Sequence, residues 1–129
     1  MQTSELTGVV LDYWTARADG LKAKMLRAGE RLNGVALDSD ICAALTPGFD
    51  NWWQPYHVTW FTLGDLIERE GLAIGPRAHP DLIATMTWAA QPYTGKSPQH
   101  IGPTPLVAAA RAFVASRFGD TVPDEPRAG

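Results

Sequence analysis

The chain has one cysteine, few charges and no excess of positive charge. Cys42 cannot form an internal disulfide, so cysteine usage gives no sign of an oxidising compartment. Charged residues make up 19% of the 129 residues and the formal net charge is −3. The global positive field typical of proteins that bind nucleic acid or anionic membranes is therefore absent, which argues against nucleic acid as a partner.

Long apolar runs are also missing. None approaches the roughly 20 residues that a membrane span requires, and the start "MQTSELTGVV" lacks the basic region and long apolar core of a signal peptide. We therefore expect a cytoplasmic protein with no membrane partner. The length predicts a single domain over residues 1–129, and the polar residues 121–129 are predicted to form a flexible tail.

The short motifs that identify common enzymes and cofactor sites are absent as well. There is no G-x-S-x-G elbow, no G-x-G-x-x-G and no phosphate-binding P-loop. The metal-ligand spacings H-x-H, H-E-x-x-H and C-x-x-C do not occur either. Cys42 lies in the apolar run of "DICAAL", where we expect a buried and inert thiol. The sequence predicts neither a cofactor nor a metal site, and favours a non-enzymatic protein.

Two segments carry clear helix start and stop signals. In "LTGVVLDYWTARADG", Thr7 is the predicted N-cap and Gly20 the stop. In "GPTPLVAAARAFVASRFGD", Thr104 is the predicted N-cap, Pro105 occupies the first helical position and Gly119 is the stop. These are the two main predicted helices.

Between them, the pattern predicts strands and a short third helix. Asn33-Gly34 favours a hairpin turn between strands at about 23–32 and 35–41, although a helical stripe also fits the first of these. "FTLGDLIEREG" predicts a short helix with Thr62 as its N-cap. Residues 72–74 predict a small strand, and alternation over 82–90 predicts a longer one. Two main helices packed on a small, mostly antiparallel sheet make an α+β fold.

Two predicted loops, residues 46–61 and 91–101, are the expected location of any function. The first holds the densest aromatic cluster of the chain, and its candidate interaction residues are Trp52, Trp53, Tyr56, His57 and Trp60. Such residues can cover the core, form a protein contact or stack nucleic-acid bases. Because base stacking needs nearby positive charge and this region is acidic, self-association is the preferred functional reading, with a homo-oligomer or another protein as partner.

Three further possibilities concern charged groups. His57 with Asp65 or Glu68 is the candidate set for a small hydrolase. The basic segment 17–31 is a candidate for weak contact with nucleic acid. Arg69 or Glu70 is a candidate for a structural salt bridge to Arg111.

Three pieces of the chain resemble one family in their order. They are "TSELTGVVLDYWTARADG", "DLIEREGLAI" and "GPTPLVAAARAFVASRFGDTVPDE", and together they are similar to the bacteriophage NinX-like proteins. The resemblance implies a phage- or prophage-derived, cytoplasmic, single-domain protein and supplies no reaction, ligand or catalytic residue. The aromatic segment "TPGFDNWWQPYHVTWFTLGD" is longer and richer in aromatics than its counterpart in the family.

Overall fold

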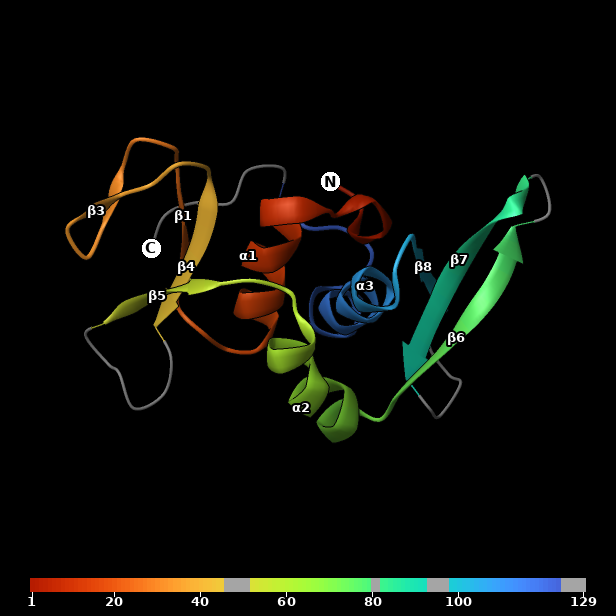
Figure 1. The fold of residues 1–129 in the computed structure, drawn as a ribbon. Coiled ribbons are helices and arrows are strands. Elements are labelled where there is room, and N and C mark those ends of the chain that lie inside the picture. Colours follow the sequence, from red (N-terminus) through yellow and green to blue (C-terminus); the bar gives the residue numbers. More distant parts are fainter. Residues whose placement is uncertain (46–51, 80–81, 93–97, 124–129) are drawn as a thin grey trace.

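A layer of helices lies between two small antiparallel sheets (Figure 1). The computed structural model describes residues 1–45, 52–79, 82–92 and 98–123, and omits the side chains of residues 78–79 and 82–86. Its elements are η1 (Thr3–Glu5), α1 (Gly8–Ala18), β1 (Ala23–Leu26), β2 (Arg31–Leu32), β3 (Val35–Ala36), β4 (Ile41–Leu45), β5 (Trp53–Tyr56), α2 (Trp60–Glu70), β6 (Leu72–His79), β7 (Leu82–Pro92), β8 (His100–Gly102) and α3 (Pro105–Phe118). The predicted α+β class is confirmed, with three helices and three small sheets in the described part.

Helix α3 forms as its terminal signals predict. The Thr104 hydroxyl accepts a 3.2 Å hydrogen bond from the Val107 N–H, and Pro105 occupies the first position. Gly119 ends the helix with φ of 85°, a value that favours glycine. Small side chains at the centre of α3 are buried and let neighbouring elements approach closely: Ala108, Ala109, Ala110 and Ala112.

Helix α1 packs against α3 on one side and against β4 on the other. It starts after Thr7, as predicted, but the Thr7 side chain makes no capping hydrogen bond, so that detail of the prediction was wrong. Gly20 follows the helix with φ of 83°. Six consecutive residues, 11–16, are buried, so α1 is covered on nearly all sides at its middle.

Helix α2 begins earlier than predicted. Its N-cap is Thr59, whose hydroxyl accepts from the Thr62 N–H, while the Thr62 hydroxyl accepts from the Thr59 N–H. This reciprocal capping box satisfies two backbone donors that the first turn leaves free. Thr62 is therefore the third residue of the helix and not its cap. Gly71 ends α2 in the left-handed conformation, with φ of 62°, as predicted.

The first sheet has the order β1-β4-β5, all antiparallel. The predicted turn at Asn33-Gly34 is present, with φ of 52° and 84°, but it joins only the two-residue strands β2 and β3. The long predicted hairpin was wrong because the chain turns again at Gly29, with φ of 90°, and β1 pairs with β4 instead. Strand β5 was predicted as loop. It contains Pro55 and forms an edge, where a missing N–H is tolerated.

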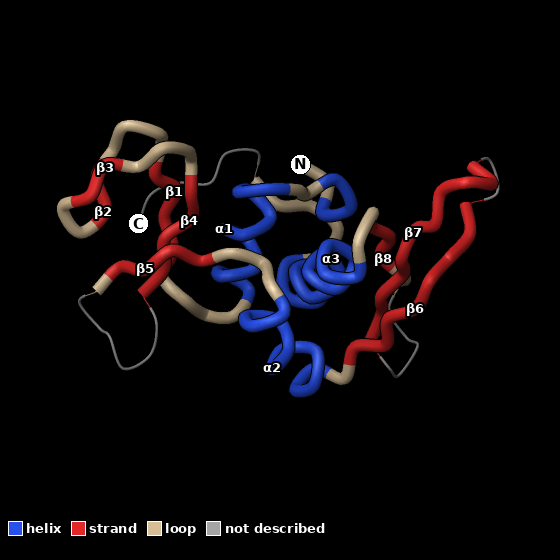
Figure 2. Tube along the Cα trace, in the orientation of Figure 1, coloured by secondary structure: helices blue, strands red, loops and turns tan. Residues whose placement is uncertain are grey.

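The second sheet has the order β6-β7-β8 and covers α3. The predicted strand over 82–90 is confirmed as β7, which continues to Pro92. Strand β6 runs beyond the predicted residues 72–74 to His79, because Pro76 lies on an edge strand. Strand β8 falls within the predicted loop 91–101. Figure 2 shows how the β6–β7 pair extends away from the helices.

The two ends of the described chain are joined. Gln2 and Thr121 form an antiparallel bridge, and Met1 and Val122 exchange backbone hydrogen bonds of 2.8 and 2.9 Å. Val122 is buried in the main core. Residues 121 and 122 of the predicted flexible tail thus pair with the N-terminal residues, and residues 124–129 lie outside the described part. Among the described helices, none has both the length and the apolar character needed to span a membrane.

Candidate interaction surface

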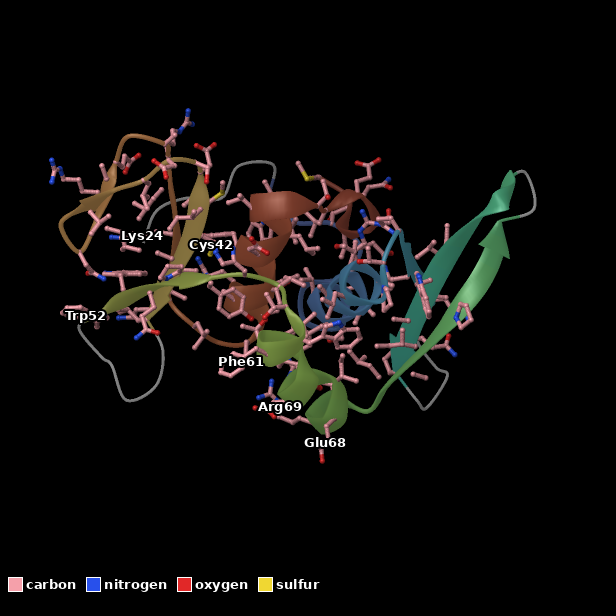
Figure 3. All side chains as sticks on the ribbon, viewed as in Figure 1. Lys24, Cys42, Trp52, Phe61, Glu68 and Arg69 are labelled. Atoms are coloured by element: carbon pink, nitrogen blue, oxygen red, sulfur yellow. The ribbon has the colours of Figure 1, made fainter. Side chains whose placement is uncertain are left out.

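The aromatic segment predicted as one unit is divided between the core and the surface. Because β5 alternates, Tyr56 lies on the inner face of the sheet and is buried, whereas Trp53 lies on the outer face and is half-buried. Trp52 is 55% exposed, and Trp60 and Phe61, at the start of α2, are 58% and 94% exposed. Figure 3 shows Trp52 at the end of β5 and Phe61 on α2. The exposed aromatic surface consists of Trp52, Trp60 and Phe61.

Trp53 contacts the basic segment 17–31, which is distant from it in sequence. The Lys24 ammonium lies 4.3 Å from the centroid of the Trp53 ring, a distance that allows a cation–π interaction. The Asn33 amide donates a 2.8 Å hydrogen bond to the Trp53 carbonyl. These contacts hold Trp53 in place, and Trp53 packs against a second, smaller core formed by Leu26, Leu32 and Ala43.

Tyr56 has a structural position beneath the sheet. Its hydroxyl is buried and has no hydrogen-bond partner among the described residues. Burial raises the pKa of this phenol, and the charge of Asp19 raises it further. Tyr56 is therefore not available to a partner at the surface.

His57 contacts Asp12 of α1 instead of the predicted carboxylates of α2. Its Nδ1 lies 3.5 Å from Oδ2 of Asp12. The other oxygen of Asp12 accepts a 2.9 Å hydrogen bond from the Val58 N–H. Burial raises the pKa of Asp12, although this hydrogen bond and His57 oppose the shift. The contacts of Asp12 anchor the connection between β5 and α2 on α1.

The predicted salt bridge to Arg111 was wrong. Arg69 donates a 2.7 Å hydrogen bond to Asp19, and Glu70 pairs with Arg117 of α3. Arg111 instead donates from Nε to the Leu6 carbonyl at 2.8 Å and from Nη1 to the Ile101 carbonyl at 2.7 Å. It therefore ties η1 and β8 to α3 through backbone acceptors.

One exposed stripe of α2 was not identified from the sequence. Phe61, Asp65 and Glu68 recur at four- and three-residue spacing and are all exposed, so they share one face of the helix. The opposite face buries Leu63 and Leu66. The helical spacing could have revealed this stripe if the start of α2 had been placed at Trp60.

A surface hollow lies at the end of α1 and the turn that follows it. Its volume is about 310 Å³, and its lining residues are Arg17, Gly20, Leu21 and Lys22. Asp19, within this same stretch of chain, accepts a 2.7 Å hydrogen bond from Arg69 of α2. Arg17 is held by a 2.9 Å hydrogen bond from Nη1 to the Tyr13 hydroxyl. The hollow thus has two cationic side chains and one apolar side chain at its border.

The second predicted functional loop, 91–101, is only partly described, because residues 93–97 lie outside the described part. Gln99 accepts a 3.0 Å hydrogen bond from Arg77 across the sheet. His100 is the first residue of β8 and is buried, and burial lowers the pKa of its imidazole. These residues brace the second sheet.

Cys42 is buried on β4, as predicted, and burial raises the pKa of its thiol to about 12. A thiol with this pKa is protonated at neutral pH. Within the described ranges, no three or more His, Cys, Asp or Glu side chains gather in a way that could hold a metal ion.

Residues 2–117 match the model of a family described as "Bacteriophage P22, NinX". No curated protein matches the chain.

Proposed function

Since the chain belongs to the bacteriophage P22 NinX family, we propose that it is a phage-derived, non-enzymatic module that acts by binding a protein. The contact is made by the exposed aromatic surface of Trp52, Trp60 and Phe61. The observation that carries the proposal is the 94% exposure of Phe61 in the first turn of a helix that buries Leu63 and Leu66 on its other face.

The exposure of these three rings has a physical cost in the free protein. Large aromatic side chains gain most from burial in protein contacts, and two of them, Trp60 and Phe61, are consecutive and both exposed at the start of α2. The chain has a well-formed core that already contains Tyr13, Trp14 and Phe113. Folding therefore does not need Trp60 or Phe61, and a binding partner supplies a reason for their exposure.

The proposal is tested by comparing the wild type, a Trp60→Ser and Phe61→Ser double variant, and Val35→Ser as a matched control. Val35 is also an exposed apolar residue, but it lies on β3, away from the aromatic surface. Each purified protein is examined by sedimentation velocity, and is used to capture proteins from phage-infected host cells. We expect the wild type and the control to bind the same partner, and the double variant to lose it.

Circular dichroism establishes that the double variant is folded. Identical sedimentation and identical captured proteins for all three forms would contradict the proposal. Loss of binding by Val35→Ser alone would place the contact on a different surface.

A further inference from the structure

We propose that the protein has a binding site for a small primary amine at the place where its two ends are joined. A surface hollow of about 230 Å³ lies there. It is lined by residues from three segments that are far apart in sequence: Gln2 and Ser4, His100, and Asp120 and Thr121. None of them belongs to the exposed aromatic surface, so this inference is independent of the proposed function.

The pairing of the chain ends builds this hollow. Gln2 and Thr121 form the antiparallel bridge, and η1 contacts β8. The Thr3 N–H donates a 2.8 Å hydrogen bond to the Asp120 carbonyl, and the Thr3 hydroxyl donates a 2.7 Å hydrogen bond to the Gly119 carbonyl. The Thr3 side chain is fully buried. The N-terminal and C-terminal walls of the hollow are therefore fixed to each other by the fold.

His100 is the buried polar residue of the hollow. It is 9% exposed, and it shares with Gly102 the face of β8 that lies against α3. Its imidazole makes no hydrogen bond or ion pair with any residue that the structure describes. Burial lowers the pKa of this imidazole, so it is neutral at pH 7 and one ring nitrogen is free to accept a hydrogen bond. Since buried polar groups are nearly always hydrogen-bonded, this nitrogen calls for a donor that enters the hollow.

Asp120 supplies the negative charge of the hollow. Within the described ranges, its carboxylate has no hydrogen bond or ion pair to another residue. Two cations of the surrounding segments are bound elsewhere: Arg111 donates to two backbone carbonyls, and the Met1 ammonium donates to the Val122 carbonyl. Neither of them lines the hollow. A cationic ligand is therefore favoured there over an anion.

The hydrogen-bonding groups of the hollow match an ammonium group. The Asp120 carboxylate and the imidazole nitrogen are joined by the Gln2 amide oxygen and by the hydroxyls of Ser4 and Thr121, and all of these can accept hydrogen bonds. A primary ammonium group has three donors, no acceptor and one positive charge. Its hydrogen bond to a carboxylate is charge-assisted and roughly twice as strong as the bond that a neutral alcohol forms.

A second, smaller hollow limits the size of the amine. It has a volume of about 70 Å³, is bordered by the same His100 and Asp120, and runs along Ala112 and Ala115 of α3. A methylene group takes up about as much space as a water molecule, roughly 30 Å³. The smaller hollow thus has room for a chain of about two or three carbon atoms. In the bound state the ammonium lies between Asp120 and His100, and the alkyl chain lies against α3.

The experiment is an NMR titration of the nitrogen-labelled full chain with propylamine at constant pH and ionic strength. Propanol is the matched neutral ligand, because it has the same carbon chain and no charge. We expect propylamine to cause saturable shifts of the backbone amide signals of residues 2–4, 100 and 119–122. Propanol is expected to leave these signals unchanged.

Two variants test the role of the carboxylate. Asp120→Asn removes the charge from an exposed side chain, and we expect it to bind propylamine at least tenfold more weakly than the wild type. Asp38→Asn removes the charge of another exposed carboxylate, which lies between β3 and β4, and is expected to leave the affinity unchanged. The amide spectra of both variants establish that they are folded.

Every outcome bears on the site. Saturable shifts at the named residues that are weakened only by Asp120→Asn would support it. Equal shifts with propylamine and propanol would overturn the assignment of an ammonium group. Equal weakening by both variants would show a general effect of net charge and would overturn the site, as would a titration in which propylamine shifts none of these signals.

Discussion

A Cβ atom added to Gly102 would lie 2.7 Å from the backbone nitrogen of Ala108, because β8 passes directly over the first turns of α3. The contact is with backbone atoms, which cannot move aside as a flexible side chain can. Even an alanine at this position therefore has to push β8 away from the helix.

We expect Gly102→Ala to lower the free energy of unfolding by about 1–3 kcal/mol, the usual cost of overpacking. Gly64→Ala is the matched control, because nothing lies within 4 Å of the added atom and the site is inside a helix, where alanine is favoured by roughly 0.5–1 kcal/mol. Chemical denaturation at one protein concentration measures both changes. Equal shifts in the same direction would contradict the close contact.

Two threonine caps allow a second comparison. The Thr104 hydroxyl accepts a hydrogen bond at the start of α3, whereas the Thr7 side chain makes no capping bond at the start of α1. We expect Thr104→Ala to lower the free energy of unfolding by about 1 kcal/mol, and Thr7→Ala to lower it by less. Thermal unfolding followed by circular dichroism gives the order, and a larger loss at Thr7 would refute it.

Two buried tyrosines differ in their hydroxyl contacts. The Tyr13 hydroxyl accepts a hydrogen bond from Arg17, while the Tyr56 hydroxyl has no partner within the described part of the chain. Tyr13→Phe is expected to cost about 1 kcal/mol. Tyr56→Phe is expected to leave stability unchanged or to raise it, because it removes a buried polar group without removing a hydrogen bond. Denaturant titrations check this, and equal losses would show that both hydroxyls are hydrogen-bonded.

The lowered pKa of His100 makes the stability of the folded protein depend on pH. Burial lowers its pKa below 6.5, with the charge of Arg111 lowering it further and that of Asp120 opposing the shift. Between the lowered pKa and 6.5 the unfolded chain binds more protons than the folded chain, so the contribution of His100 to stability falls as the pH falls through this range.

The variant His100→Gln lacks this titration. We expect the difference in unfolding free energy between wild type and variant to be largest at about pH 8 and to shrink towards about pH 5. Denaturant unfolding across this range provides the measurement. A difference that stays constant with pH would show that His100 does not titrate differently on folding.

The sequence predicted best where the signals are local. Helix α3 follows from Thr104, Pro105 and Gly119, each of which acts on its own turn. The same reasoning misplaced the start of α2, because Thr59 and Thr62 both fit a cap and only the geometry of the capping box distinguishes them. Strand β5 was missed because Pro55 is read as a breaker unless the strand is known to form an edge.

The partners of the charged residues could not be predicted, because they lie far apart in sequence. His57 contacts Asp12, and Arg69 contacts Asp19, whereas the sequence offered Asp65 or Glu68 as a candidate partner of His57. Similarly, Asp19 lies in the turn that follows α1, and Arg69 lies in the last turn of α2. No spacing within either segment indicates that the two meet.

The bridge between Gln2 and Thr121 has a mechanical consequence. A force that pulls the two ends of the chain apart acts first on this antiparallel bridge and the hydrogen bonds of Met1 and Val122. These bonds break one after another, as in a zipper, before the load reaches α1 and α3. The pairing of these two segments thus bears a pulling force before the helices do.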